Sequence, residues 1–157
     1  MLDALVGLQQ AYPQRFPLDP MLNETGRAAV ATVKTQCVVQ TLVSFPFTRF
    51  SQLSRGGETL QQFDARPDVA SVFAENNLGD RPAPTVPILQ YHAVADEIVP
   101  IAQARALHDQ WCAKGARTVF TLVLGDHIVG ETAGLPAAIG WLSDRFAGLP
   151  APTGCNG

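Results

Sequence analysis

Two ionisable side chains stand where this sequence could carry out acid–base chemistry. Asp96 follows the short apolar run 86–91, and His127 follows a second such run, 118–124. Apolar runs of this length, bounded by turn residues, predict buried strands. A carboxylate that accepts a hydrogen bond from one imidazole nitrogen leaves the other nitrogen free to deprotonate a nucleophile. Asp96 and His127 are therefore the candidate acid and base.

The order of these two residues adds to that interpretation. Loops at the carboxyl ends of parallel strands meet at one edge of a sheet, so we expect Asp96 and His127 to converge there. An acid followed by a histidine is also the order that α/β-hydrolases use after their serine. The alternative is a structural role, in which Asp96 caps its loop and His127 caps the next helix.

Four other residues compete for these roles. Glu97 is a rival acid, although only one of two adjacent carboxylates can face the histidine. Asp126 is better suited to organising the turn. His92 comes before the acid at a strand end, where we expect it to pack the loop. His108 lies in the middle of a predicted helix beside an aspartate, which predicts a solvated position.

No residue in the sequence has the context of a nucleophile. A serine nucleophile needs flanking glycines at the spacing Gly-x-Ser-x-Gly, because its backbone is strained and a helix packs behind it. Cys112 falls inside a predicted helix, and three scattered histidines give no metal-binding pair, so we predict neither metal nor cofactor. The five serines that lack flanking glycines at this spacing are Ser44, Ser51, Ser54, Ser71 and Ser143.

Composition narrows the class of protein. The chain has 157 residues, of which 46% are hydrophobic and 16% charged, as in globular proteins with a core. Its net charge of −3 argues against nucleic-acid binding. We predict no transmembrane segment, since no apolar run reaches the ~18 residues required. The start, with a charge at Asp3, does not predict a signal peptide.

The three cysteines leave two interpretations open. Cys112 and Cys155 flank the His127 loop and could join the tail to the preceding helix, which would leave Cys37 over. An unpaired cysteine in an oxidised protein suggests a partner outside the chain. The other interpretation is three buried free thiols.

Residues 1–44 predict helices. Apolar spacing predicts a first helix that ends at Tyr12, before Pro13. A second, longer helix is expected to open at the N-cap residue Asn23 and to run to Phe45, with Cys37 on its packed face.

The region before residue 80 contains one further predicted helix. Residues 48–66 predict a loop with a short helical turn, and a helix is expected over 67–76, with Pro67 at its first position. The proline-rich stretch 80–84 is the best internal boundary. It divides the chain into a helical region, 1–80, and an alternating region, 81–157.

The region 81–157 predicts an α/β fold. The two strands alternate with helices expected over 100–114 and 136–148, an order that implies parallel pairing. Two parallel strands alone leave apolar edges bare, so we expect this region to need more sheet or to self-associate.

Several motifs resemble the C-terminal half of the secretory lipase family, microbial α/β-hydrolases of the lipase A type. The front of the chain also resembles that family's helical cap, so the resemblance covers nearly all of the sequence. Its most specific blocks are Asp96-Glu97-Ile98-Val99-Pro100 and Asp126-His127-Ile128, in this order. The other matching blocks are Tyr91-His92, Trp111-Cys112 and Trp141-Leu142-Ser143-Asp144-Arg145-Phe146.

The resemblance implies an extracellular enzyme that hydrolyses acyl esters, triacylglycerols among them, with Asp96 and His127 as triad acid and base. It implies that region 1–80 is a cap over an apolar acyl-chain tunnel. The family's serine, oxyanion-hole donors and signal peptide would lie upstream of Met1, as would a partner for Cys37. The alternatives are a non-catalytic truncated module, or part of another α/β-hydrolase such as a peptidase or acyltransferase.

Overall fold

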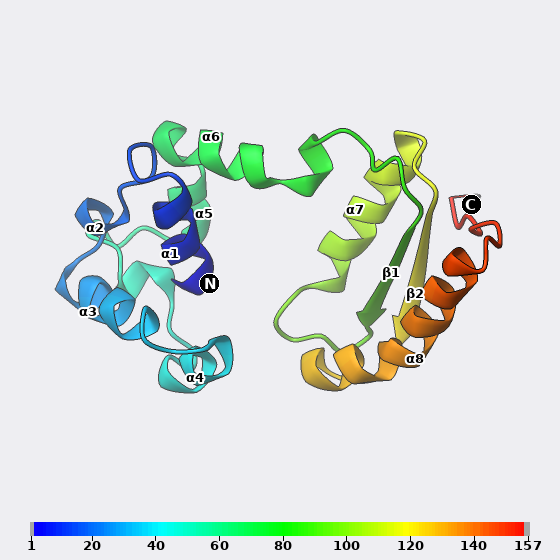
Figure 1. The fold of residues 1–157 in the computed structure, drawn as a ribbon. Coiled ribbons are helices and arrows are strands. Elements are labelled where there is room, and N and C mark those ends of the chain that lie inside the picture. Colours follow the sequence, from blue (N-terminus) through cyan, green and yellow to red (C-terminus); the bar gives the residue numbers. More distant parts are fainter. Residues whose placement is uncertain (1, 156–157) are drawn as a thin grey trace. The chain divides into compact units, whose positions relative to one another are not determined.

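The computed structural model describes residues 2–155 and divides the chain into two compact units between Asn77 and Leu78 (Figure 1). This division lies three residues before the boundary expected at 80. Each unit has its own packing.

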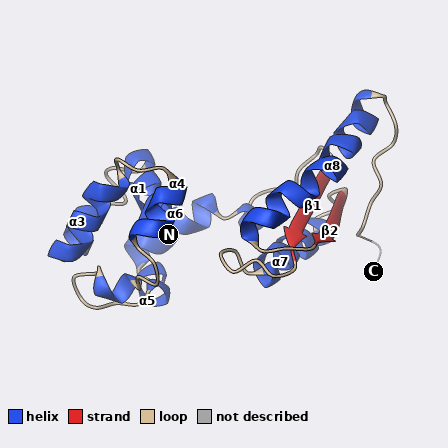
Figure 2. Cartoon of the chain, turned by 90° about the horizontal axis from the view of Figure 1, so that it is seen from below, coloured by secondary structure: helices blue, strands red, loops and turns tan. Residues whose placement is uncertain are grey.

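The front unit consists of helices and connecting loops in the residues that the structure describes (Figure 2). The helix predicted over 67–76 is present with those bounds, and 48–66 contains two short helices rather than one turn. In chain order the helices are α1 (Leu2–Ala11), α2 (Leu18–Met21), α3 (Glu24–Val33), α4 (Val38–Ser44), η1 (Phe50–Gln52), α5 (Leu60–Asp64) and α6 (Pro67–Asn76).

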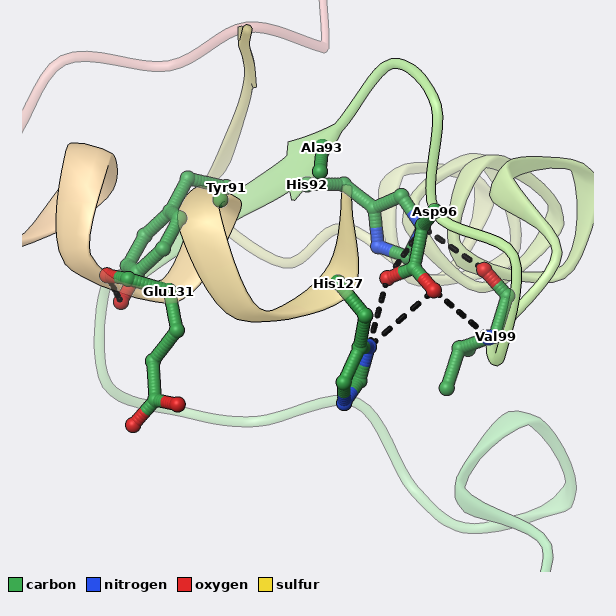
Figure 3. A pocket seen from close by; sticks show the side chains of 8 residues that line it. Tyr91, His92, Ala93, Asp96, Val99, His127 and Glu131 are labelled. Atoms are coloured by element: carbon green, nitrogen blue, oxygen red, sulfur yellow. Dashed lines mark hydrogen bonds and ion pairs between the residues drawn. The ribbon is translucent and has the colours of Figure 1, made fainter. Parts of the chain in front are cut away.

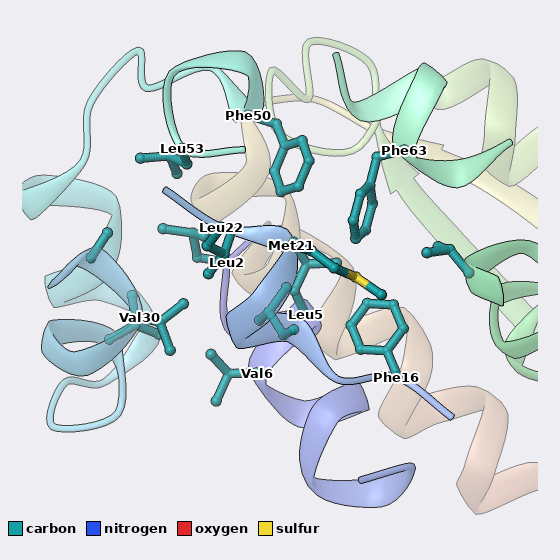
Figure 4. Close-up of a cluster of buried hydrophobic side chains, with 14 of the residues drawn as sticks. Leu2, Leu5, Val6, Phe16, Met21, Leu22, Val30, Phe50, Leu53 and Phe63 are labelled. Atoms are coloured by element: carbon teal, nitrogen blue, oxygen red, sulfur yellow. The ribbon is translucent and has the colours of Figure 1, made fainter. Parts of the chain in front are cut away.

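An aromatic cluster forms the centre of this unit's core (Figure 4). The rings of Phe16 and Phe63 are fully buried and meet edge to face, with centroids 6.0 Å apart. Phe50 packs on Phe63 from the other side, at 4.6 Å. Complete burial of a phenylalanine stabilises a fold by about 1.5–3 kcal/mol, so these rings are a principal source of the unit's stability.

The long helix expected from Asn23 to Phe45 is wrong, because it is two helices. Asn23 does cap α3, accepting a hydrogen bond from the Gly26 amide at 2.8 Å, but α3 ends at Val33. Cys37 is the N-cap residue of α4, and its backbone amide donates a hydrogen bond to the Gln40 side-chain oxygen at 2.9 Å. Cys37 is exposed rather than packed. The local side-chain cap outweighs the apolar spacing that suggested one continuous helix.

The back unit has two parallel strands between helices, as predicted. Its elements are η2 (Leu78–Asp80), β1 (Ile88–Ala93), α7 (Ile101–Ala113), β2 (Thr118–Val123) and α8 (His127–Phe146). The register runs from Ile88 beside Thr118 to Ala93 beside Val123. Helix α8 packs mainly on β1 and α7 mainly on β2, from opposite faces of the sheet (Figures 1 and 2).

The last helix begins nine residues earlier than predicted. Its start was expected at Pro136, but Asp126 caps α8 by accepting the Val129 amide at 2.8 Å, and the helix runs from His127 through Pro136. Proline in a helix interior removes one backbone hydrogen bond, which the rest of this 20-residue helix tolerates.

The cysteine alternatives are resolved in favour of a disulfide. Cys112 and Cys155 are bonded, with Cα atoms 5.2 Å apart, and Cys37 is free. The disulfide holds the tail against the start of β2, where the Gly154 amide donates to the Thr118 carbonyl at 2.8 Å. No helix within residues 2–155 is both long and apolar enough to cross a membrane.

Candidate active site

The loops after β1 and β2 come together at one end of the sheet. The Val94 amide donates to the Val123 carbonyl at 3.0 Å, and the Ala95 amide donates to the Gly125 carbonyl at 3.1 Å. These bonds continue the parallel ladder beyond the strands. Gly125 has a φ of 126°, a conformation that residues with a Cβ rarely adopt, and it turns the chain from β2 into α8. The loop bearing Asp96 is thereby fixed beside the first turn of α8.

Asp96 and His127 form a hydrogen-bonded pair (Figure 3). His127 Nδ1 lies 3.0 Å from Asp96 Oδ1 and 2.9 Å from Oδ2. The same Oδ1 accepts the amides of Ile98 at 3.0 Å and Val99 at 2.7 Å. A carboxylate accepts only, so Nδ1 carries the hydrogen in this contact and Nε2 is left for another partner.

The surroundings of the pair favour its charged form. Burial alone would raise the pKa of Asp96, but hydrogen bonds from the Val99 amide, the His127 ring and the Ile98 amide outweigh it and lower the pKa to about 2. The hydrogen bond to Asp96 raises the pKa of His127 above its usual value, against the opposing effect of burial. Negative charge on Asp96, Glu97 and Glu131 raises it further.

Two glycines allow α8 to lie close to β1. A Cβ on Gly130 would overlap Ala93, and one on Gly134 would overlap the ring of Tyr91. The Tyr91 hydroxyl donates to the Glu131 carbonyl at 3.2 Å across the same contact. This close approach brings the N-terminus of α8, and with it His127, to the tip of β1.

The competing residues make contacts other than the one between Asp96 and the His127 ring. Glu97 accepts the backbone amide of His127 at 3.2 Å, so the rival acid binds the main chain and Asp96 binds the ring. Asp126 organises the turn, as expected. The solvated position predicted for His108 is wrong: the ring is half-buried, with Nδ1 3.3 Å from Thr118 Oγ1 and Nε2 3.6 Å from Cys112 Sγ. It packs inward because its helix face covers β2.

A cavity of about 350 Å³ opens beside the pair. Of its polar lining residues, sequence reasoning missed Glu131. His92 was expected to pack the loop at the strand end, and its Nε2 lies 3.0 Å from the Val99 carbonyl of that loop. Glu131 lies one helical turn after His127. This spacing would have predicted that both side chains share one face of α8 if the sequence had shown that the helix begins at His127. The lining residues of the cavity are Tyr91, His92, Ala93, Asp96, Val99, His127, Gly130 and Glu131.

Within the described residues, no group of three or more His, Cys, Asp or Glu side chains could hold a metal ion.

A parallel sheet between helices, with an acid and then a histidine at neighbouring strand ends, defines the chain as part of an α/β-hydrolase fold. The structure superposes on Candida antarctica lipase A with a TM-score of 0.81, over 96% of this chain and 36% of that one, at 23% identity. The closed state of the same lipase matches with the same score over 99% of this chain. The fold class expected from the sequence is confirmed.

The profile of the secretory lipase family matches residues 1–154, and the chain belongs to that family. It is 31% identical to Lipase 10 of Candida albicans, over 98% of this chain and 34% of the relative. It is 27% identical to the secreted triacylglycerol lipase LIP1 of Malassezia furfur, over 99% of this chain and 33% of the relative. The chain therefore spans about a third of the length of these curated relatives.

Proposed function

We propose that this chain is the C-terminal portion of a secreted triacylglycerol lipase and supplies the acid and base of its catalytic triad. The observation that carries the proposal is the hydrogen bond of 2.9–3.0 Å between His127 Nδ1 and the Asp96 carboxylate, at the tips of adjacent parallel strands. No Gly-x-Ser-x-Gly occurs in the sequence, so the nucleophile comes from outside these 157 residues.

In the proposed reaction His127 acts twice. Its Nε2 takes the proton from the serine hydroxyl as the oxygen attacks the ester carbonyl, and then gives that proton to the departing alcohol. Water repeats the sequence on the acyl-enzyme and releases the fatty acid. Asp96 holds the ring and balances the imidazolium charge. A pKa of about 2 keeps its carboxylate ionised throughout, so it does not take the proton itself.

The substrate class and the location rest on the relatives and on the disulfide. Two of the relatives carry the names secreted triacylglycerol lipase LIP1 and LIP5. The Cys112–Cys155 bond suits an oxidising compartment outside the cell. We also propose that the helical front unit acts as a cap that shapes an apolar site for the acyl chain.

The first test uses the purified chain alone. Hydrolysis of p-nitrophenyl esters should not exceed that of the His127→Ala variant, because the chain provides no serine for the histidine to activate. Turnover that depends on His127 would refute the claim that the nucleophile lies outside the chain.

The second test restores the missing part. The chain replaces the matching third of Candida albicans Lipase 10, and the secreted chimera is assayed on triolein emulsions. His127→Ala should abolish activity, and Asp96→Asn should lower kcat by about 10⁴-fold, because the ring then adopts the wrong tautomer. His108→Gln, a change at a histidine outside the site, is the matched control and should retain activity. An active chimera that tolerates His127→Ala would overturn the proposal.

A further inference from the structure

His92 is a nearly buried polar residue that the proposed reaction does not use. It lies near the end of β1, and its side chain is 11% exposed. Successive side chains on a strand point to opposite faces, so His92 lies on the face away from Tyr91 and Ala93, which contact α8. Its ring reaches from there toward the loop that bears Asp96 (Figure 3).

The contacts of His92 fix its tautomer. Nε2 lies 3.0 Å from the Val99 carbonyl oxygen, and a carbonyl can only accept. Nε2 must therefore carry the hydrogen. The same nitrogen lies 3.6 Å from Asp96 Oδ2, beyond a normal hydrogen bond but close enough to attract the carboxylate.

Val99 is therefore held through both its backbone carbonyl and its backbone amide. Its carbonyl accepts from His92, and its amide donates to Asp96 Oδ1 at 2.7 Å. This amide gives the shortest of the hydrogen bonds that orient the Asp96 carboxylate. A group that fixes Val99 therefore also fixes the direction in which the carboxylate faces.

We propose that His92 is a positioning residue, which anchors the acid loop through the Val99 carbonyl and so keeps Asp96 aimed at His127. The inference rests on the proposed function for its catalytic meaning. The hydrogen bond of His92 Nε2 goes to the Val99 carbonyl oxygen, so the role we assign to it is positioning and not catalysis. Without its N–H, Val99 can turn and the Asp96 carboxylate loses the orientation that satisfies His127 Nδ1.

The first measurement needs only the wild-type chain. Nitrogen-15 NMR of the histidine side chains distinguishes a ring protonated at Nε2 from one protonated at Nδ1. We expect neutral His92 to be the Nε2–H tautomer. An Nδ1–H tautomer would overturn the proposal, since the bond to Val99 could not then exist.

The second measurement compares two amide variants of different reach. The amide nitrogen of glutamine in His92→Gln can occupy the position of Nε2, whereas the shorter side chain of His92→Asn cannot reach Val99. The pKa of His127, followed through its ring resonances, should stay near its wild-type value in His92→Gln. It should fall by about 0.5 unit or more in His92→Asn, because the hydrogen bond to Asp96 is the main cause of its elevation.

The direction of the change separates positioning from simple electrostatics. If His92 acted only as a dipole beside Asp96, its removal would leave the carboxylate freer to attract His127 and would raise the pKa of that ring. A pKa that rises or stays unchanged in His92→Asn therefore refutes the proposal. Thermal unfolding of each variant shows whether the back unit remains folded.

The wild-type titration also separates this inference from the proposed function. A His127 pKa at its ordinary value in the unaltered chain would mean that the Asp96–His127 pair does not form, and both proposals would fall. An elevated wild-type pKa that His92→Asn leaves unchanged would refute the role of His92 alone.

Discussion

The close contact between α8 and β1 makes a prediction about Gly130→Ala. A Cβ at this position would lie 3.3 Å from Ala93 Cα and would overlap Ala93 Cβ. Neither atom belongs to a flexible side chain that could turn aside. To restore an ordinary carbon–carbon contact, α8 must retreat from β1 by about 1 Å.

The magnitude follows from two opposing effects. Alanine in place of glycine inside a helix stabilises it by about 1 kcal/mol, whereas overpacking costs about 1–3 kcal/mol. Gly140→Ala on the same helix is the matched control, because a Cβ there meets nothing within 4 Å. Since the propensity gain is common to both, Gly130→Ala should be less stable than Gly140→Ala by about 1–3 kcal/mol.

The same displacement should weaken the hydrogen bonds between Asp96 and His127. His127 lies three residues before Gly130, so a shift of about 1 Å takes its distances to the Asp96 oxygens, 2.9 and 3.0 Å, beyond hydrogen-bonding range. The pKa of His127 should then fall toward its ordinary value in Gly130→Ala and stay elevated in Gly140→Ala.

Tryptophan fluorescence during urea unfolding measures the stability difference. Both tryptophans of the chain, Trp111 and Trp141, belong to the back unit, so the signal reports on that unit. NMR titration of His127 gives the second readout. Gly130→Ala as stable as Gly140→Ala, with an unchanged His127 pKa, would refute the claim that close helix packing positions the histidine.

Four further predictions follow from the structure. The unfolding free energy of the back unit should fall as pH drops from 3.8 to about 2, because in this range Asp96 is protonated in the unfolded chain but still ionised in the folded one. Acid denaturation curves of Asp96→Asn should lack this pH dependence. The Cys112–Cys155 disulfide joins residues 43 positions apart, so its reduction should lower that free energy by up to about 4 kcal/mol. Urea titrations with and without reductant measure the difference. Asn23→Ala should destabilise the front unit by about 1–3 kcal/mol, because it removes the cap of α3 and donors to the Gln52 and Ser54 carbonyls; Asn23→Asp, which keeps the cap, should cost less in thermal unfolding. The isolated chain should self-associate through exposed apolar side chains such as Phe146, which is 90% exposed; elution as a stable monomer in size-exclusion chromatography would contradict this.

Local patterns in the sequence determined most of the back unit. The two apolar runs predicted β1 and β2, the latter to within one residue, because a short apolar run between turn residues has few other stable states. The helix expected over 100–114 is α7, which ends at Ala113, and the φ of 82° at Gly115 suits the turn that stops it. The order of the elements then required parallel strands, and that order alone placed Asp96 and His127 at the same edge.

Side-chain capping and packing decided what the sequence could not. Whether α3 continues past Val33 depends on the Gln40 side chain that caps α4, and the start of α8 depends on the Asp126 cap rather than on Pro136. The spacing of apolar residues does not predict these polar contacts. The sequence also left the cysteine pairing open, because pairing depends on the separation of Cα atoms in space.

The hydrogen-bond partners of the three histidines are also decided by the tertiary structure. The residue types identified three imidazoles, but only the tertiary structure distinguishes a ring bound to Asp96, a ring anchored to the Val99 carbonyl and a ring packed against β2. Strand order carries a side chain to the correct edge of the sheet. The hydrogen bonds that orient it there come from residues distant in the chain, and only the folded packing brings them within reach.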